Sequence, residues 1–281
     1  MSNPLFTQLE MDGFQTIYKN EFAENWRKNL LEDAKTEVEQ CKNVKLLPQS
    51  ARLTLWQFCT KLCITKDGVP GHACRLVERY LMAQLRNYKK MAETVQRRKF
   101  IRKLKEEFLL TLMVAIQLSA KMSCTEKKDD STLVRFWLLS YGCSFTLTDI
   151  REKEFAIIRD LEFRIPLWTG VDTALMLAVE ANMTESVMET IALMMDTAEF
   201  FRKEIAEKVG ETVGTSKENV FIRTIHLAAA AVSAVAELIK ENFEDTINTV
   251  AKVTAAPVDY VNVIKSILLN IFGDCSGEVM F

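Results

Sequence analysis

The fold is decided by one almost wholly apolar run, Phe108-Leu-Leu-Thr-Leu-Met-Val-Ala-Ile-Gln-Leu-Ser-Ala-Lys-Met122. A helix that is apolar on all sides has to lie inside a bundle, because an exposed face would leave apolar area in water. The small residues Ser119 and Ala120 would let neighbouring helices approach this helix closely. We therefore predict a central helix over residues 108–122, surrounded by other helices.

A second run closes the same region, Glu152-Lys-Glu-Phe-Ala-Ile-Ile-Arg-Asp-Leu-Glu-Phe-Arg-Ile-Pro166. Phe155, Ile158 and Leu161 recur at helical spacing, so this run predicts a partly buried helix. Proline disfavours helical geometry in the residue before it. We therefore expect Pro166 to end the helix.

Composition favours a helix-rich protein. The 281 residues are enough for two domains of ordinary size, each with its own core. Nine Gly, five Pro and 48% hydrophobic residues suit helices joined by short connections. The seven Cys are an odd number without a Cys-x-x-Cys pair, and no apolar signal segment opens the sequence. We expect an intracellular protein in a reducing compartment, with no membrane partner because the longest apolar run is shorter than a membrane span.

Residues 1–46 are predicted to form an N-terminal extension with one helix, about 14–42. Its apolar residues lie at approximate helical spacing with dense charge between them, which indicates an amphipathic helix. Such a stripe usually packs on a core, and we expect it to pack on the first domain. The apolar positions are Phe22, Trp26, Leu30, Leu31 and Val38.

The most charged segment covers residues 86–105. Nine Lys and Arg residues face Glu93 alone, a net charge of +8 in a chain whose net charge is −2. Lys and Arg at this density can bind phosphate backbones by releasing counterions. The same density is typical of a solvated helix surface or a flexible insertion. The candidate nucleic-acid contacts are Arg97, Arg98, Arg102 and Lys103.

No catalytic constellation is visible in the sequence. It contains no Gly-rich phosphate loop, no Gly-x-Ser-x-Gly and no His-Glu-x-x-His. Cys59, Cys63, His72 and Cys74 could form a zinc set, because residues four apart share a helix face. Their spacing differs from that of the usual paired-cysteine zinc sites, and buried cysteines are common in cores. We predict a protein that is not an enzyme, with no metal and no cofactor.

The two runs resemble the third and fifth helices of a cyclin box. In that pattern an apolar helix ends small-small-Lys, matched by Ser119-Ala120-Lys121. About thirty residues later a Glu opens a helix that ends Leu-x-Phe-x-hydrophobic, matched by Glu154 and by Leu161-Glu-Phe-Arg-Ile165. In cyclins this Lys and Glu hold the backbone of the partner kinase beside its mobile regulatory helix. The resemblance thus implies a heterodimer with a cyclin-dependent kinase.

Further kinase contacts are implied at Phe155, Ile158 and Phe163, which match apolar cyclin positions at that interface. These three could equally be core residues. Lys121 in a last turn and Glu154 in a first turn would also suit the helix dipole without any partner.

Within the cyclin superfamily, the chain resembles the meiotic crossover-associated cyclin N-terminal domain-containing protein 1 family. The segments 116–123 and 161–165 and the long basic insertion before Phe108 carry this resemblance. It implies a nuclear, chromosome-associated protein of meiotic cells that designates and matures crossovers in DNA recombination, with recombination factors among its partners.

The expected fold is all-α, with two tandem five-helix cyclin boxes preceded by the N-terminal helix. The first box covers residues 47–168 with the basic insertion at about 86–105, the second covers 169–273, and a tail covers 274–281. Residues 226–237 form a second small-residue central helix. The helices of the second box are expected near 171–181, 184–209, 218–240, 244–254 and 257–272.

The substrate-docking motif of cyclins, Met-Arg-Ala-Ile-Leu in the first helix, reads Ala51-Arg-Leu-Thr-Leu55 here. Its larger apolar anchors are lost, so the resemblance does not extend to substrate docking. Three functions remain open: a non-catalytic regulator of a cyclin-dependent kinase, a cyclin-fold adaptor that binds DNA or recombination or transcription factors without activating a kinase, and a conventional cell-cycle or transcription cyclin.

Overall fold

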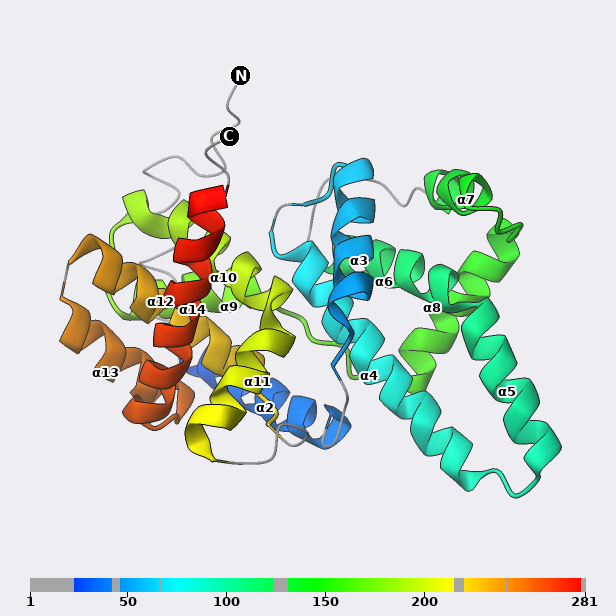
Figure 1. Cartoon of the computed structure of the whole chain (residues 1–281), viewed down its shortest axis with the longest axis horizontal. Coiled ribbons are helices and arrows are strands. Elements are labelled where there is room, and N and C mark those ends of the chain that lie inside the picture. The colour runs from blue at the N-terminus through cyan, green and yellow to red at the C-terminus, as the bar shows by residue number, and fades with distance from the viewer. Residues whose placement is uncertain are drawn as a thin grey trace.

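The computed structural model describes residues 23–41, 46–65, 67–123, 131–214, 220–240 and 242–278. These ranges hold thirteen α-helices and no strand (Figure 1). The all-α prediction is confirmed. The helices are α2 Ala23–Cys41, α3 Gln49–Lys61, α4 Val69–Lys90, α5 Thr94–Glu106, α6 Phe108–Met122, α7 Ser131–Ser140, α8 Leu147–Asp160, α9 Gly170–Glu180, α10 Met188–Phe200, α11 Arg202–Val213, α12 Thr224–Ile239, α13 Phe243–Thr254 and α14 Val258–Glu278, with a short 3-10 helix η2 at Glu185–Val187.

Buried apolar side chains form two clusters, each around one central helix. The first core combines α3, α4, α6, α7 and α8, and residues 110–120 of α6 are all buried. The second core combines α2 with α9 to α14, and residues 224–236 of α12 are all buried. Figure 1 shows the two groups of helices side by side. The prediction of a buried central helix over 108–122 is confirmed, with the same bounds.

The N-terminal helix packs differently from the expectation. Its buried apolar residues Trp26, Leu30 and Ala34 belong to the second core. On its other side Asp33 lies 3.3 Å from Arg79 of α4. The helix therefore joins the two cores instead of lying on the first alone. The part of it expected before residue 23 lies outside the described residues.

The helix α8 ends earlier than predicted. Its last residue is Asp160, because Glu162 and Phe163 adopt left-handed φ angles of 56° and 60°. The amide of Phe163 donates to the carbonyl of Ile158 at 3.0 Å and closes this turn. Pro166 therefore does not end the helix, and Phe163 lies beyond it.

The single helix expected near 184–209 is also divided. The structure has η2, α10 and α11 over this range, with the break at Phe201. Phe200 and Phe201 meet edge to face at the break, 4.9 Å between ring centroids.

The two cores meet at a cluster of charged side chains that we call the arginine network. Arg52, Arg79 and Arg202 are the three largest side chains that are fully buried in the described residues. An isolated charge cannot be buried at this depth without a partner of opposite sign. The network has four arginines and four carboxylates: Arg52, Arg75, Arg79 and Arg202 with Asp33, Glu37, Glu78 and Glu199.

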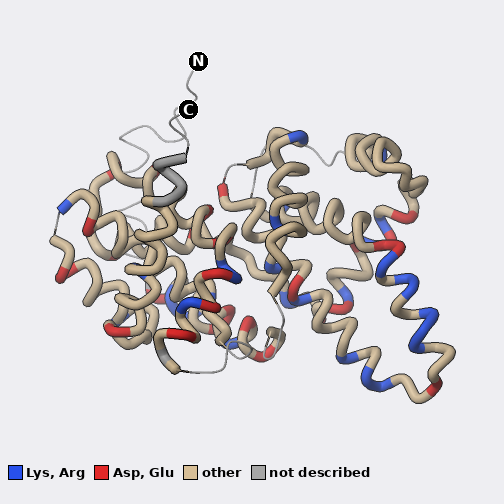
Figure 2. Tube along the Cα trace, viewed as in Figure 1, with Lys and Arg blue, Asp and Glu red and all other residues tan. Residues whose placement is uncertain are grey.

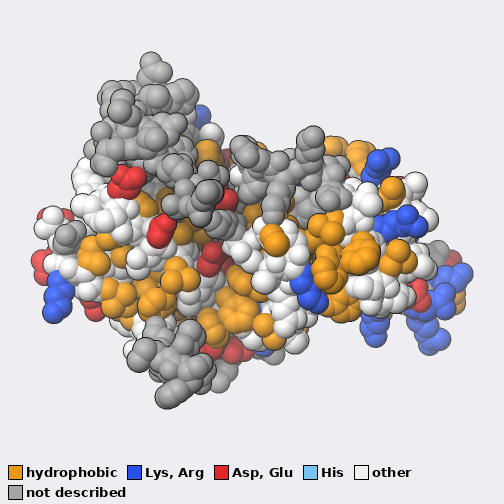
Figure 3. Space-filling view, turned by 90° about the horizontal axis from the view of Figure 1, so that it is seen from above, with side chains coloured by type: hydrophobic (Ala, Val, Ile, Leu, Met, Phe, Trp, Pro, Cys, Tyr) orange, Lys and Arg blue, Asp and Glu red, His pale blue; other side chains and the backbone are white. Residues whose placement is uncertain are grey.

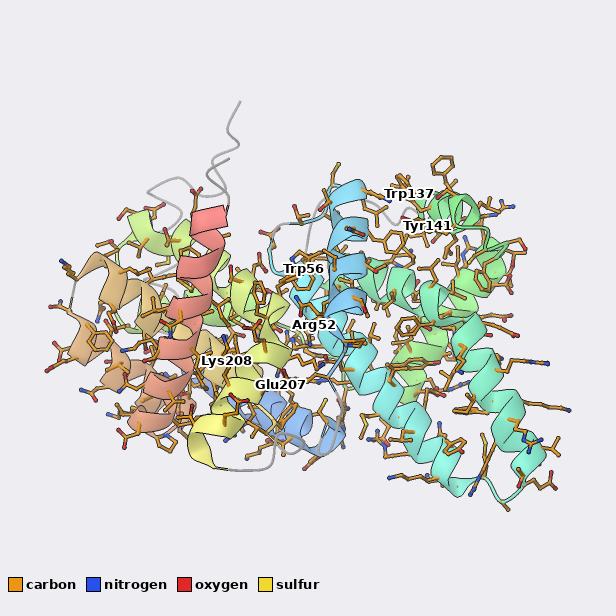
Figure 4. The ribbon with its side chains drawn as sticks, in the orientation of Figure 1. Arg52, Trp56, Trp137, Tyr141, Glu207 and Lys208 are labelled. Atoms are coloured by element: carbon orange, nitrogen blue, oxygen red, sulfur yellow. The ribbon has the colours of Figure 1, made fainter. Side chains whose placement is uncertain are left out.

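One side of the network joins α3 and α4 to α10. The Arg52 guanidinium pairs with Glu78 and donates to the carbonyl oxygen of Glu199 at 2.6 Å. Figure 4 shows Arg52 at the end of α3 that faces the second core. Arg75 donates to the carbonyl of Trp168, at 2.9 Å, and so ties α4 to the segment between α8 and α9.

The other side joins α2 to α11 and α12. Arg202 lies 2.8 Å from Glu37 and donates to the hydroxyl of Thr224 at 3.1 Å. The amide of Thr224 donates to Glu37 at 2.9 Å. Burial raises the pKa of Glu37, but Arg202, Arg79 and Arg75 together lower it to about 2. Glu37 is therefore a carboxylate at neutral pH.

Side chains of α10 approach the backbone closely at two glycines of the junction, Gly71 of α4 and Gly170 at the start of α9. A Cβ on Gly71 of α4 would lie 2.8 Å from Cγ of Glu199, and a Cβ on Gly170 would lie 2.6 Å from Cε of Met195. The Glu199 side chain, which is buried in the network, would have to shift to admit a side chain at Gly71, whereas Cε is the flexible end of Met195 and can move aside. The two cores are therefore held together by close packing as well as by charge.

Removing one arginine of the network tests whether it holds the cores together. We expect Arg202→Met to lower the free energy of unfolding by about 3–5 kcal/mol, because Glu37 is left buried without its main partner. Urea unfolding measures this loss. The control is Arg164→Ala, which removes an exposed pair with Glu39 and should cost less than about 0.5 kcal/mol. Equal losses in the two variants would contradict the proposed role of the network.

Asp196 of α10 makes the junction sensitive to pH. Burial, with Glu199 and Asp67 nearby, raises its pKa from 3.8 to about 7. Between these values the folded protein binds a proton that the unfolded chain does not, so stability falls as pH rises through this window. We expect Asp196→Asn to raise the melting temperature at pH 8 and to raise it by much less at pH 5, where only the lower part of this window has been crossed. A rise of the same size at both pH values would contradict this assignment.

Candidate partner-binding surface

Lys121 and Glu154 form an ion pair, although 33 residues separate them in the chain. Lys121 lies in the last turn of α6 and Glu154 in the middle of α8, with 2.7 Å between Nζ and Oε1. Their side chains are 31% and 18% exposed, so the pair lies at the surface without being fully hydrated. Because α8 begins at Leu147, Glu154 is not in a first turn, and the helix-dipole explanation does not apply to it.

The start of α8 fixes which way Glu154 faces. Thr146 caps the helix, accepting from the amide of Asp149 at 3.1 Å, and its own amide donates to the Asp149 carboxylate at 2.7 Å. Ile150 and Ile157 are fully buried in the first core and set the rotation of the helix. Glu154 then lies beside the end of α6.

The Glu154 carboxylate retains acceptor capacity beyond its bond to Lys121. An ammonium has three donors, and a carboxylate has about four acceptor sites on its two oxygens. The bond to Lys121 uses one oxygen of Glu154. A donor and an acceptor held side by side can bind the carbonyl and the amide of one backbone segment.

Two of the three apolar candidates are exposed. Phe155 is 56% exposed and Phe163 is 68% exposed, so the interpretation of these two as core residues is wrong. Ile158 is partly buried and packs against the first core. On α8, Glu154, Phe155 and Ile158 share one face, because residues three and four apart are neighbours on a helix. Phe163 follows in the left-handed turn.

A groove of about 590 Å³ runs along α8 beside this face. Its apolar lining includes Leu110, Phe145, Phe155 and Ala156, and the junction of α5 and α6 forms its other wall. Phe155 thus belongs both to the predicted residues and to the groove. Sequence reasoning missed the groove, because its walls come from segments about forty residues apart.

Two further exposed apolar residues follow Phe163. Leu167 is 64% exposed and Trp168 is 38% exposed, in the segment between α8 and α9. Large exposed apolar side chains near one another in the chain often mark a protein-binding surface. Their signal was present in the sequence, as two bulky apolar residues directly after a proline in a connecting segment.

The cysteine and histidine set is structural. Cys59 and Cys74 are fully buried, whereas Cys63 is exposed. The ring of His72 lies 2.9 Å from Oγ of Ser119 and 3.0 Å from the carbonyl oxygen of Pro166. Burial, with Arg75 nearby, lowers the pKa of His72 to about 3. Among the residues that the structure describes, no group of three or more His, Cys, Asp and Glu side chains is placed to hold a metal ion.

Two residues of the segment 51–55 are fully buried inside the structure. Arg52 is fully buried in the arginine network, and Leu55 is fully buried in the first core. Leu53 is exposed at 47% and is the apolar residue of the motif that faces solvent.

The four basic candidates all lie on α5, which has no buried residue. Arg98, Arg102 and Lys103 are exposed, and Arg97 is partly exposed. The structure does not bring the four to one face. Lys103 lines the groove along α8, whereas the other three line a separate hollow on α5.

No protein-family model matches the chain, and no curated protein matches it in sequence. Among the described helices, none is long and apolar enough by itself to cross a membrane; the stretches 243–254 and 258–273 reach the required length and composition only as a pair bent by 115°.

A double-mutant cycle tests the ion pair in the free protein. We expect Lys121→Met and Glu154→Gln to be coupled by about 0.5–1 kcal/mol in the free energy of unfolding, the range for a pair at the surface. Urea unfolding of the wild type, the two single variants and the double variant gives the coupling. A coupling of zero would mean that the pair contributes nothing to the stability of the free protein.

Proposed function

We propose that this chain is a non-catalytic, cyclin-like regulatory partner of a cyclin-dependent kinase. The observation that carries the proposal is the Lys121–Glu154 ion pair, held at the surface with Glu154 on the helix that carries the exposed Phe155, and with Phe163 exposed in the turn after that helix. These residues match the cyclin positions that bind the kinase, and they come from segments that only the fold brings together.

The composition of this surface suits a protein partner. Protein interfaces are enriched in aromatic residues at the centre, with polar groups that fix orientation. Phe155 and Phe163 would supply apolar anchors, while Lys121 and Glu154 would bind backbone groups of the mobile kinase helix. Holding that helix in place would keep the Lys–Glu pair and the activation loop of the kinase in their active arrangement.

The helix arrangement supports two tandem cyclin boxes. The first core is built from five helices, α3, α4, α6, α7 and α8, with α6 at the centre and α5 outside it. The second core repeats a buried central helix, α12, rich in small residues. The role in meiotic crossover designation, in the nucleus, is supported by the resemblance of the segments 116–123 and 161–165.

The kinase interface is tested by exchanging the two charges. In Lys121→Glu/Glu154→Lys the side chains can still attract each other, so the fold should keep its stability. The kinase backbone would then face a carboxylate at position 121, where it needs a donor, and an ammonium at position 154, where it needs an acceptor. We expect the affinity for the cyclin-dependent kinase that binds the wild type to fall by about a hundredfold or more, measured by co-purification from a panel of kinases and by calorimetry.

The matched control is Glu204→Lys/Lys208→Glu, which exchanges a 2.8 Å pair on α11. It should bind the kinase as the wild type does. Equal binding by both exchanged variants would exclude this surface, and a wild-type chain that binds no kinase in the panel would exclude the proposed function. A kinase assay on the complex then separates an activator from a scaffold.

A further inference from the structure

The C-terminal end of α4 and the helix α5 form a hairpin that projects from the first core (Figures 1 and 2). Within α4, residues 69–80 are all buried, whereas residues 85–87 are exposed. Tyr88 of α4 and Phe100 of α5 hold the two arms together, 6.2 Å between ring centroids. The space-filling view shows Lys and Arg side chains gathered at this end of the molecule (Figure 3).

One face of the hairpin forms a basic hollow of about 540 Å³. Its α5 residues recur at three- and four-residue spacing, which places them on one side of the helix. Tyr88 comes from the facing arm, and the Arg97 guanidinium lies 5.5 Å from the centroid of its ring. The hollow is lined by Tyr88, Thr94, Arg97, Arg98, Ile101, Arg102 and Lys105.

Arg97 stabilises the hairpin itself, because its Nε donates to the carbonyl of Met91 at 2.9 Å and its guanidinium lies over the Tyr88 ring. The stability of the hairpin does not explain Arg98, Arg102 and Lys105. Arg98 and Arg102 are four residues apart and Arg102 and Lys105 are three apart, so like charges repel along the helix. Glu106 lies 3.5 Å from Arg102 and reduces this repulsion in part, but both side chains are exposed to solvent. No side chain of α5 is buried, and these cations therefore contribute nothing to a core. Binding of a polyanion would neutralise these charges and remove the repulsion between them, so the repulsion in the free protein favours binding.

We infer that this hollow binds the backbone of a single-stranded nucleic acid. Arginine and lysine neutralise phosphates, and the Arg97 guanidinium, which lies over the Tyr88 ring, offers its outer plane as a surface on which bases stack without sequence selection. The bases of a duplex are stacked on one another, so only a single strand can place its bases against a side-chain plane in the hollow. Of the four basic residues predicted from the sequence, Lys103 lines the groove along α8 and not the hollow, whereas Lys105, which was not predicted, lines the hollow.

This site is independent of the kinase-binding surface. None of the residues that line the hollow belongs to the set Lys121, Glu154, Phe155, Ile158 and Phe163. The full-length chain can therefore lose one activity and keep the other.

The test is fluorescence anisotropy of the full chain with a labelled 20-nucleotide oligothymidine, between about 50 and 200 mM salt. The wild type should bind with a slope of log K against log salt of about −2 to −3, because each of four phosphates contributes about −0.7 on single strands. We expect Arg97→Gln/Arg98→Gln/Arg102→Gln/Lys105→Gln to bind at least about tenfold more weakly, with a slope near zero.

The control variant changes four surface cations elsewhere, Arg164→Gln/Lys203→Gln/Lys208→Gln/Lys252→Gln, and so removes the same charge. Arg164 and Lys252 are exposed, and Lys203 and Lys208 are partly exposed. It should keep the affinity and the slope of the wild type within about twofold. A second variant, Tyr88→Ala, should weaken binding and leave the slope unchanged, because stacking releases no counterion. Circular dichroism checks that each variant keeps its helix content.

Each other outcome overturns the inference. No binding by the wild type at 50 mM salt, or equal losses in the two fourfold variants, excludes the site. Equal or tighter binding to a matched duplex excludes the preference for a single strand. Binding to phosphatidylserine vesicles that the hairpin variant loses, without binding to the oligonucleotide, assigns the hollow to membranes instead. An RNA oligonucleotide of the same length, run in parallel, distinguishes the two nucleic acids.

Discussion

The buried charges between the two cores constrain the rest of the structure. Arg202 reaches Glu37 of α2, Glu199 of α10 and Thr224 of α12 from one position. Leaving a buried charge without its partner lowers the free energy of unfolding by several kcal/mol. These helices are therefore expected to pack against one another cooperatively. An apolar junction would tolerate sliding, whereas hydrogen-bonded charges fix one relative position of the helices. The network therefore sets the position of the second core on the first, and with it the rotation of α4.

The helix α4 carries that constraint outward. Its buried part contributes Arg75, Glu78 and Arg79 to the junction, and its other end becomes one arm of the basic hairpin. The ion pair rests on α6 and α8, which are anchored in the first core, whereas the hollow lies on α5, which has no buried residue and is attached to the core through α4 and α6 at its two ends. Sites built on anchored helices keep their geometry better than sites on loops. The hollow and the ion pair can thus act on different partners without depending on a mobile segment.

Sequence reasoning succeeded where the signal is local. The apolar run gave the bounds of α6, and the resemblance selected Lys121 and Glu154, which the fold places 2.7 Å apart. It failed where the outcome depends on distant contacts. An amphipathic stripe identifies α2 but not the core that receives it, and a pair such as Glu37 and Arg202, 165 residues apart, leaves no pattern in the chain. The left-handed turn after α8 was missed because Glu162 and Phe163 are residue types that rarely adopt it.

The position of α2 also sets an order of events during synthesis. This helix precedes the whole first core in the chain, yet its apolar face is part of the second. Glu37 finds the amide of Thr224 only after another 187 residues have been made. The five helices of the first core can fold on the ribosome in the meantime, since domains generally fold as units from the N-terminus. Trp26 and Leu30 stay without their native cover through that interval, and a nascent chain in this state is a natural client for a chaperone.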